Sequence, residues 1–205
     1  MRAFIRGRCG TITRQFLLDA YMNLGRQVEL VTDASPWGMG GYITVDKRIQ
    51  GFFSSKLSED DIAIFGQARG DCRGQQAWEA LAMLVALRLW ADTWLKGRVR
   101  VRVRGDSVAM LTAVMHMNAT SGGSTILIAR EVALDVAESA YAPDVGGHLP
   151  GDANVTADAL SRRWDPDAGE WRPPLALTGA TEAVAPQRTR AYYRTLAPPV
   201  SGETA

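Results

Sequence analysis

The sequence is poor in the residues that build zinc sites and disulfide frameworks, with two cysteines and two histidines among 205 residues. Cys9 and Cys72 lie far apart and neither belongs to a CxxC pair, so free thiols in a reducing compartment are expected. Long apolar runs are also missing. The longest, Ala77 to Ala91, is broken by Glu79 and Arg88 and is shorter than the roughly 20 residues that a membrane-spanning helix needs. We therefore expect no membrane partner.

An excess of charge of either sign is missing as well, because 23 Lys and Arg residues nearly balance 22 Asp and Glu residues, for a net charge of +1. Binding to nucleic acid would therefore depend on a local group of basic side chains. The arginines between Met1 and Leu18 are compatible with a transit peptide or with a chain cut from a longer polyprotein, and we favour the second. The 46% hydrophobic content suits one core domain of roughly 150 residues plus terminal segments.

The central feature of the sequence is an apolar run that ends in a carboxylate. Val28 to Val31 suit a buried strand, residues 34–38 are rich in turn formers, and Gly41 to Val45 is typical of a returning strand. Asp33 would then lie at the rim of a hairpin. A carboxylate held against a sheet is costly unless a cation, a metal or hydrogen-bond donors meet it, so Asp33 is a candidate functional residue.

The remaining pattern predicts alternating helices and strands. The expected helices are Thr13–Leu24, Gln75–Leu95, Val108–Met117, Ser124–Ser139 and Ala153–Ser161, and the expected further strands are Ile49–Ser54, Arg98–Asp106 and Pro143–Leu149. This order predicts an α/β sheet with an antiparallel first half and later strands added through right-handed crossovers.

Two charged stretches have several interpretations. The arginines that alternate through Arg98–Asp106 would line a phosphate path, face solvent or pair with acids. The acidic run Glu59–Asp61 is interpreted as a solvated face or the start of a helix.

Four acids are expected to converge at one edge of this sheet. Asp33 and Asp106 end strands, while Glu79 and Asp158 lie on helices that can overhang the same place. Compensation of the helix dipole would alone explain Glu79. A cluster of four carboxylates repels itself unless divalent cations fill it, and hard oxygen ligands suit magnesium, with manganese as the alternative. Two such ions roughly 3.5 to 4 Å apart would clamp a phosphodiester for in-line attack.

At these positions the sequence resembles the ribonuclease H domain of reverse-transcribing elements, most closely that of gypsy-type and tyrosine-recombinase retrotransposons. The resemblance extends over about Val28 to Arg163. Its motifs are TDAS..G.GGYI at Thr32–Ile43, WEALAMLVAL at Trp78–Leu87, GDS at Gly105–Ser107 and HLPGDANVTADALSR at His148–Arg162. The spacing HxxxxxNxxxD is the most telling part. Gly105 departs from the family pattern, which more often has a bulkier residue before the strand-end Asp.

The resemblance implies a ribonuclease H-like fold with a five-stranded mixed sheet, three antiparallel strands followed by two parallel ones, flanked by helices. It also implies the site residues. These are the metal-binding acids Asp33, Glu79, Asp106 and Asp158, the catalytic loop histidine His148, and the substrate-binding residues Asn154, Ser35 and Ser107. For His148 and Asn154, roles as a surface residue and a helix-capping residue are the alternatives.

The implied activity is that of an endonuclease that cleaves the RNA strand of an RNA/DNA hybrid with two Mg²⁺ or Mn²⁺ ions during reverse transcription. Its partners would be the hybrid and a polymerase domain of the same polyprotein, within the cytoplasm or nucleus. Two alternatives remain: an idle connector or binding module of the same fold, and an integrase or transposase core. Intact acids disfavour the first, and the His-Asn-Asp block disfavours the second.

Three regions are predicted. Residues 1–27 would form a connecting helix left from an upstream region, and residues 28–163 the ribonuclease H-like domain. Residues 164–205 are rich in Pro, Gly and Arg and show no apolar periodicity, so we expect them to be mostly disordered.

Overall fold

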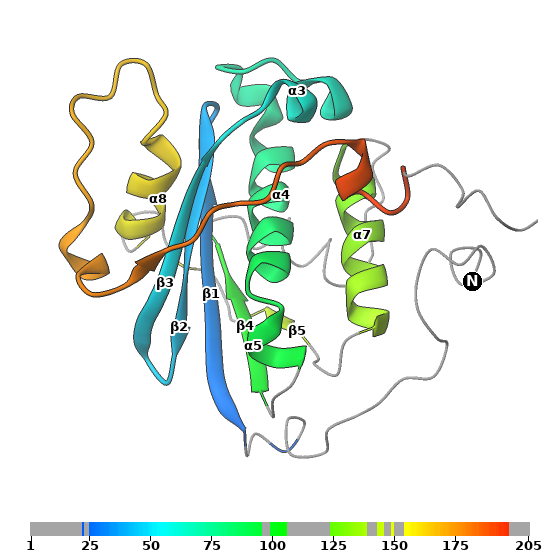
Figure 1. The fold of residues 1–205 in the computed structure, drawn as a ribbon. Coiled ribbons are helices and arrows are strands. Elements are labelled where there is room, and N and C mark those ends of the chain that lie inside the picture. The colour runs from blue at the N-terminus through cyan, green and yellow to red at the C-terminus, as the bar shows by residue number, and fades with distance from the viewer. Residues whose placement is uncertain are drawn as a thin grey trace, which may run out of the picture.

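Six strands form one mixed sheet in the order β5–β4–β1–β2–β3–β6 (Figure 1). This computed structural model describes residues 22, 25–95, 99–105, 124–138, 143–145, 149 and 154–196. Helices cover both faces of the sheet, so the domain has three layers. The helix predicted over Thr13–Leu24, of which Met22 alone is described, and the helix predicted over Val108–Met117 lie outside these residues.

The first three strands form an antiparallel meander. They are β1 (Arg26–Ala34), β2 (Gly38–Val45) and β3 (Arg48–Lys56). Each extends one to three residues beyond the predicted bounds, except at Val45, where β2 ends as predicted. Asp46 and Lys47 join β2 to β3 with φ angles of 50° and 69°. Positive φ at both central residues is the signature of a primed turn, whose twist matches that of the strands it joins.

The other strands run parallel to their neighbours. β4 (Val99–Arg104) pairs with β1, and β5 (Pro143–Val145) pairs with β4. The predicted ribonuclease H-like fold, with three antiparallel strands followed by two parallel ones, is therefore confirmed. At the opposite edge, β6 (Thr181–Glu182) adds a short sixth strand parallel to β3, which the sequence did not predict.

The long apolar helix forms the middle of the core. α4 (Gln75–Leu89) packs on β1 and β2, and α7 (Ser124–Glu138) packs against α4 on the same side of the sheet. α4 ends six residues earlier than predicted, and the chain turns into the short α5 (Asp92–Leu95). α8 (Val155–Arg162) lies on the opposite face, against β1, β2 and β3.

The acidic run begins a helix, as one of the two interpretations proposed. Ser58 caps α3 (Glu59–Phe65) by accepting a hydrogen bond from the Asp61 N–H, while the Asp61 carboxylate accepts one from the Ser58 N–H. This reciprocal capping box satisfies two backbone donors that the helix itself leaves unpaired. Asp61 is fully buried, so its charge requires a partner from elsewhere in the chain.

One arginine of the β4 stripe, Arg104, is paired with an acid. Arg104 Nε lies 2.5 Å from Glu29 Oε1 on the neighbouring strand β1. Both side chains are about one-third exposed. Among the three interpretations of the stripe, pairing with acids therefore holds at Arg104, while Arg98 lies outside the described residues.

The segment after α8 is ordered through Leu196, contrary to the disorder predicted for residues 164–205. It contains η3 (Leu175–Leu177), β6 and η4 (Arg190–Tyr192) and runs along the β3 edge to α7, in orange and red in Figure 1. Leu177 packs with Phe52 and Leu160, and Tyr193 is fully buried in the main core. We call residues 177–196 the strap. Single buried anchors hold it, and such anchors produce no periodic sequence signal.

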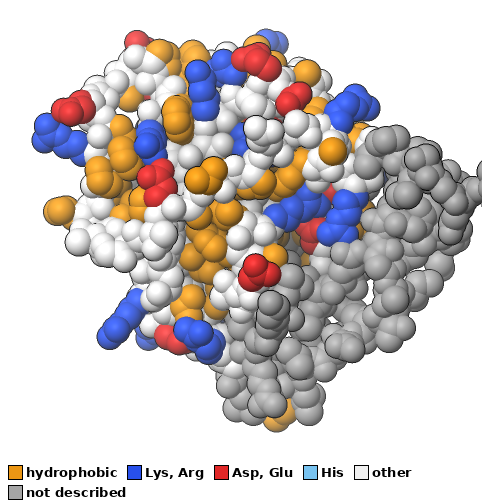
Figure 2. Space-filling model, viewed as in Figure 1, with side chains coloured by type: hydrophobic (Ala, Val, Ile, Leu, Met, Phe, Trp, Pro, Cys, Tyr) orange, Lys and Arg blue, Asp and Glu red, His pale blue; other side chains and the backbone are white. Residues whose placement is uncertain are grey.

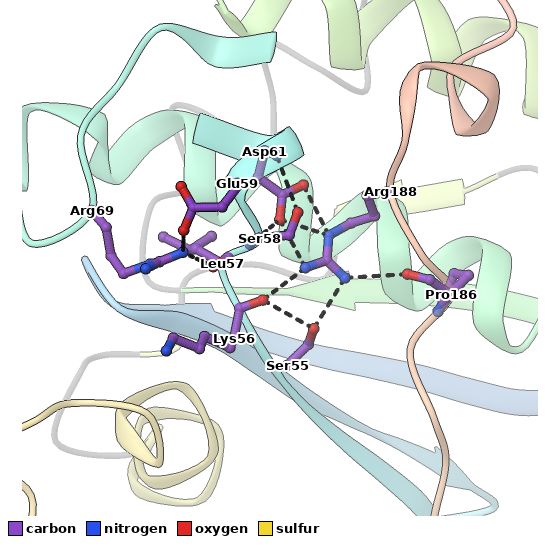
Figure 3. Close-up of polar contacts among 9 residues, drawn as sticks. All are labelled: Ser55, Lys56, Leu57, Ser58, Glu59, Asp61, Arg69, Pro186 and Arg188. Atoms are coloured by element: carbon purple, nitrogen blue, oxygen red, sulfur yellow. Dashed lines mark hydrogen bonds and ion pairs between the residues drawn. The ribbon is translucent and has the colours of Figure 1, made fainter. Parts of the chain in front are cut away.

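The first polar anchor of the strap is a buried ion pair between Arg188 and Asp61 (Figure 3). Arg188 Nε lies 3.0 Å from both carboxylate oxygens, and Nη2 lies 2.8 Å from Oδ2. The same guanidinium donates to the Lys56 carbonyl and the Ser55 hydroxyl. Side-chain exposures of 4% and 0% show that neither charge of the pair is solvated, so each depends on the other.

The second polar anchor joins the strap to α4 and α7. Arg88 of α4 donates to Glu131 and Asp135 of α7 and to the Tyr192 carbonyl. Burial alone would raise the pKa of Glu131, but hydrogen bonds from Thr195 and Arg88 bring the pKa below its ordinary value. Because the folded protein holds this carboxylate charged, the stability it contributes is lost as the pH falls through that lowered pKa.

The described surface carries no broad excess of one charge on the face shown in Figure 2, where Lys and Arg side chains are interspersed with Asp and Glu side chains. Within the described part of the chain, no helix has the length and apolar character needed to cross a membrane.

Replacing Arg188 with alanine should destabilise the domain strongly. The change leaves the Asp61 carboxylate buried without its cation, and removing one partner of a buried pair typically costs about 3–5 kcal/mol. The free energy of unfolding, measured by urea denaturation, should fall by this amount. Arg190→Ala is the matched control, because Arg190 is exposed, and should change it by less than about 0.5 kcal/mol. Equal effects of the two substitutions would show that the strap is not anchored through Asp61.

Candidate active site

Asp33 lies near the C-terminal end of β1, a central strand of the sheet, at the place where α8 crosses this strand. It is opposite Gly40 in the register of β1 and β2 and is partly buried. The Ser161 hydroxyl donates to Asp33 Oδ2 at 2.8 Å. Ser161 itself is fully buried, so α8 and the carboxylate of Asp33 are held against each other.

Glycines on β2 let α8 approach the sheet closely. A Cβ atom placed on Gly40 would lie 2.3 Å from Leu160 Cβ and 2.7 Å from the Leu160 carbonyl carbon. A Cβ atom on Gly38 would lie 2.7 Å from the Trp164 ring. Contacts this short are excluded for real atoms, so any side chain at Gly40 would push α8 away. Two of the three glycines of the TDAS..G.GG motif, Gly38 and Gly40, therefore serve packing of the helix that carries Asp158.

Two further serines hold the C-terminal end of α8. Ser35 Oγ donates to the Ser161 carbonyl at 2.9 Å, and Ser54 Oγ donates to the Leu160 carbonyl at 2.7 Å. The last carbonyls of a helix have no partner within the helix, so these side chains satisfy acceptors that would otherwise be buried unpaired. Ser35 comes from the β1–β2 turn and Ser54 from β3, and together they fix the distance between α8 and the sheet.

Asp158 lies on the first turn of α8, three residues before Ser161. The Ser161 hydroxyl is 2.9 Å from the main-chain carbonyl oxygen of Asp158 as well as 2.8 Å from the Asp33 carboxylate, so it links the backbone of α8 at Asp158 to the side chain of Asp33. The Asp158 carboxylate contacts Arg162 Nε at 2.6 Å. The pKa of the Arg162 guanidinium is raised, first by the hydrogen bond and charge of Asp158 and further by the charge of Asp33.

Glu79 is linked to the same edge of the sheet through Gln75. Gln75 Nε2 donates to the carbonyl of Ala34 at 2.5 Å and to Glu79 Oε1 at 3.2 Å. Ala34 follows Asp33 directly, so the side chain of Glu79 is oriented relative to β1 by one glutamine a turn earlier on α4. This contact gives Glu79 a defined position beyond the dipole compensation that any acid early in a helix provides.

Asn154 and Ser35, assigned to substrate binding from the sequence, are 2% and 4% exposed. Asn154 Nδ2 donates to the carbonyl of Thr32 at 3.5 Å, directly before Asp33, and makes no side-chain hydrogen bond to its own helix. Ser35 holds the β1–β2 turn by accepting from Trp37 N–H and Gly38 N–H. Buried side chains engaged with the backbone are suited to positioning, while substrate binding by Asn154 and Ser35 stays a prediction.

Three predicted site residues, Asp106, Ser107 and His148, lie outside the described residues. The structure does describe Gly105 at the end of β4, which is adjacent and parallel to β1. The Leu149 N–H donates to the Gly105 carbonyl at 3.4 Å. The chain next to Asp106 and the chain next to His148 therefore meet at the end of β4.

The donor chemistry at this edge fits a hard divalent cation. Asp33 and Asp158 supply carboxylate oxygens, which Mg²⁺ and Mn²⁺ prefer over nitrogen or sulfur. Over the part of the chain that the structure describes, no group of three or more His, Cys, Asp or Glu side chains could hold a metal ion. Asp33, Glu79 and Asp158 thus do not form a complete site by themselves.

Sequence reasoning missed Ser161, Gln75 and the spacing role of Gly40. Ser161 had a detectable signal, because it lies three positions after Asp158, and this spacing places both residues on one side of α8. Gln75 had a similar signal, four residues before Glu79 on α4. The role of Gly40 had none in the sequence, because it depends on a helix that lies 120 residues later in the chain.

Comparisons with known proteins give the following matches. No family model matches the chain, and no curated protein matches it. Among solved structures, RNase H1 from the halophilic archaeon Halobacterium salinarum is 19% identical, with 69% of this chain and 99% of that chain covered and a TM-score of 0.48. An RNase H1 isolated from compost by a metagenomic approach is 18% identical, with 67% and 94% covered and a TM-score of 0.49. The N-terminal RNase H domain of a Mycobacterium tuberculosis protein is 15% identical, with 66% and 90% covered and a TM-score of 0.45.

Replacing Gly40 with alanine should displace α8 and destabilise the domain. The new methyl group would overlap Leu160, and overpacking of this kind costs typically about 1–3 kcal/mol. Gly169→Ala is the matched control, since no atom lies within 4 Å of the Cβ it would add. Unfolding in urea measures both. The close approach of α8 to β2 would be contradicted if Gly40→Ala were as stable as Gly169→Ala.

The Ser161 hydroxyl should be energetically coupled to Asp33. A hydrogen bond to a charged group contributes roughly 1.5–3 kcal/mol, and partial exposure of Asp33 should reduce this to about 1 kcal/mol. The measurement is a double-mutant cycle of Ser161→Ala and Asp33→Ala by chemical denaturation. Strictly additive losses would mean that the hydroxyl donates to the Asp158 carbonyl and not to Asp33.

Proposed function

We propose that this protein is a ribonuclease H, a metal-dependent endonuclease that cleaves the RNA strand of RNA/DNA hybrids. The observation that carries the proposal is the contact of α8 with β1, in which the Ser161 hydroxyl meets the Asp33 carboxylate and the main-chain carbonyl of Asp158. The sheet around it has the ribonuclease H-like strand order. The motifs TDAS and HLPGDANVTADALSR place the same acids in the positions that the resemblance assigns to metal binding.

The residues that would hold Mg²⁺ or Mn²⁺ are Asp33, Glu79, Asp106 and Asp158. Two such ions, when bound, activate a water molecule and stabilise the leaving oxygen of the phosphodiester. Two neighbouring side chains orient the carboxylates of these acids. Ser161 and Gln75 hold the Asp33 and Glu79 carboxylates in fixed orientations, so little rearrangement is needed when the substrate arrives.

His148 is proposed to act beside the acids and not among them. It precedes Pro150 and Gly151 in the sequence, a pair that predicts a turn, so the sequence predicts a loop position for His148 near the acid cluster. Its imidazole would orient the scissile phosphate or help product leave, while Ser107 would contact the substrate beside Asp106. Recognition of the hybrid would rest on its shape and on the 2′-OH of the RNA strand, which DNA lacks.

The biological setting that we propose is reverse transcription in the cytoplasm or nucleus, with a polymerase domain of the same polyprotein as partner. Its support is the resemblance of the motifs to retroelement domains. The ordered strap adds that the hydrolase unit extends at least to Leu196, so a partner would join the domain outside residues 26–196.

Cleavage of end-labelled substrates tests the activity directly. The protein with magnesium should cut the RNA strand of an RNA/DNA hybrid and leave a DNA duplex of the same sequence intact. Asp33→Asn should lower the rate by far more than 10³-fold, because loss of a ligand exceeds the usual 10² to 10⁴-fold contribution of one acid–base group. Asp165→Asn, a change of equal charge outside the predicted ligands, is the control. Absence of hybrid cleavage by a folded protein would favour the connector or binding module, and cutting of the DNA duplex would favour another nuclease.

A further inference from the structure

Arg162 is a cation bound to a predicted metal ligand. Its Nε lies 2.6 Å from Asp158 Oδ1, one helical turn earlier on α8. A surface pair of this spacing usually contributes little to stability. Here the acid has a second use, because Asp158 is the α8 residue that the proposed function assigns to the divalent ion. The guanidinium occupies Oδ1 of this carboxylate and repels a divalent cation that approaches it, so the two positive charges oppose each other at Asp158.

The two terminal nitrogens of Arg162 remain available. Among the described residues, the guanidinium makes no other hydrogen bond than the one from Nε to Asp158. The side chain is 61% exposed, so no packing prevents it from turning away from the helix. By contrast, the next residue, Arg163, is held between the Trp164 and Trp171 rings and pairs with Glu182. Arg162 is thus the movable member of this pair of arginines.

The position of Arg162 also suits a phosphate. The guanidinium contacts Asp158 directly, and the proposed function puts the scissile phosphate at the ions that Asp158 would hold, so Arg162 would lie close to the cleaved strand. The chain carries a net charge of only +1, so binding to the phosphate backbone of the nucleic acid requires individual arginines near the site. A planar guanidinium donates two parallel hydrogen bonds to phosphate oxygens, which makes arginine well suited to the task.

We propose that Arg162 is a phosphate-binding residue that competes with the divalent cation for Asp158. When the cation takes the Asp158 carboxylate, the guanidinium is displaced and binds a backbone phosphate of the cleaved strand. Cation and substrate binding then support each other, because the first frees the residue that the second uses. This inference rests on the proposed function and adds a substrate contact to it.

The competition is tested by isothermal titration calorimetry with magnesium chloride and no nucleic acid. Arg162→Gln should bind Mg²⁺ about two- to five-fold more tightly than the unchanged protein, because the ion no longer displaces a guanidinium. Arg162→Lys should fall between the two. Arg172→Gln is the matched control, since it removes the same charge from an exposed ion pair with Glu170 and should leave magnesium affinity unchanged. A tightening of equal size in Arg172→Gln would be a net-charge effect and would overturn the competition.

The phosphate contact is tested with the hybrid cleavage assay at several salt concentrations. Arg162→Gln should raise KM about ten-fold with kcat little changed, and should lower the slope of log(kcat/KM) against log[salt] by about one. A structural residue would not tighten magnesium binding and weaken substrate binding together. If the unchanged protein binds magnesium and cleaves the hybrid while Arg162→Gln matches it in both, this inference alone fails. If the unchanged protein does neither, the proposed function fails with it.

Discussion

The candidate site depends on how closely α8 can approach β2. Gly40 leaves room for the Leu160 backbone, and three serines, from the β1–β2 turn, β3 and α8, then satisfy the carbonyls and the carboxylate that this approach buries. A larger residue at Gly40 would separate the surfaces and leave those polar groups unpaired. The position of Asp158 relative to Asp33 is therefore decided by the absence of a side chain on the neighbouring strand. The strap reinforces it, because Leu177 packs in one apolar cluster with Leu160 and Phe52.

Most of the sheet could be predicted because its residues carry a local signal. Strands that bury one face alternate apolar and polar residues, and the Asp46–Lys47 turn sits between two such runs. The order of elements then restricted the topology through the rules on handedness and crossovers. The end of the long helix was misplaced because apolar residues continue past Leu89 into α5, where Trp94 is buried as deeply as the helix itself.

The strap could not be predicted, because its contacts are single and distant in sequence. In the sequence, nothing distinguishes Arg188 from the other arginines of a polar segment, because its partner Asp61 is distant in the chain. The positions of Asp33, Glu79 and Asp158 followed from motifs, but the residues that orient them did not. A serine can cap a helix, stabilise a turn or donate a hydrogen bond to a carboxylate, and its partner decides which of these it does. For Ser161 that partner is Asp33, 128 residues away in the sequence.

The pairing of Arg188 with Asp61 joins residues 127 positions apart, and this has a consequence for how the chain folds. Contacts with such long loops form late, since the loop-closure entropy must be overcome before the contact contributes anything. During synthesis from the N-terminus, α3 is made early, and its Asp61 stays solvated. Asp61 can be buried only after the strap has been made, because Arg188 of the strap supplies the cation that pairs with it. The sheet and α4 can collapse in that interval, but β3 remains an open edge. The last residues of the domain thus decide when it stops being prone to pairing with other chains.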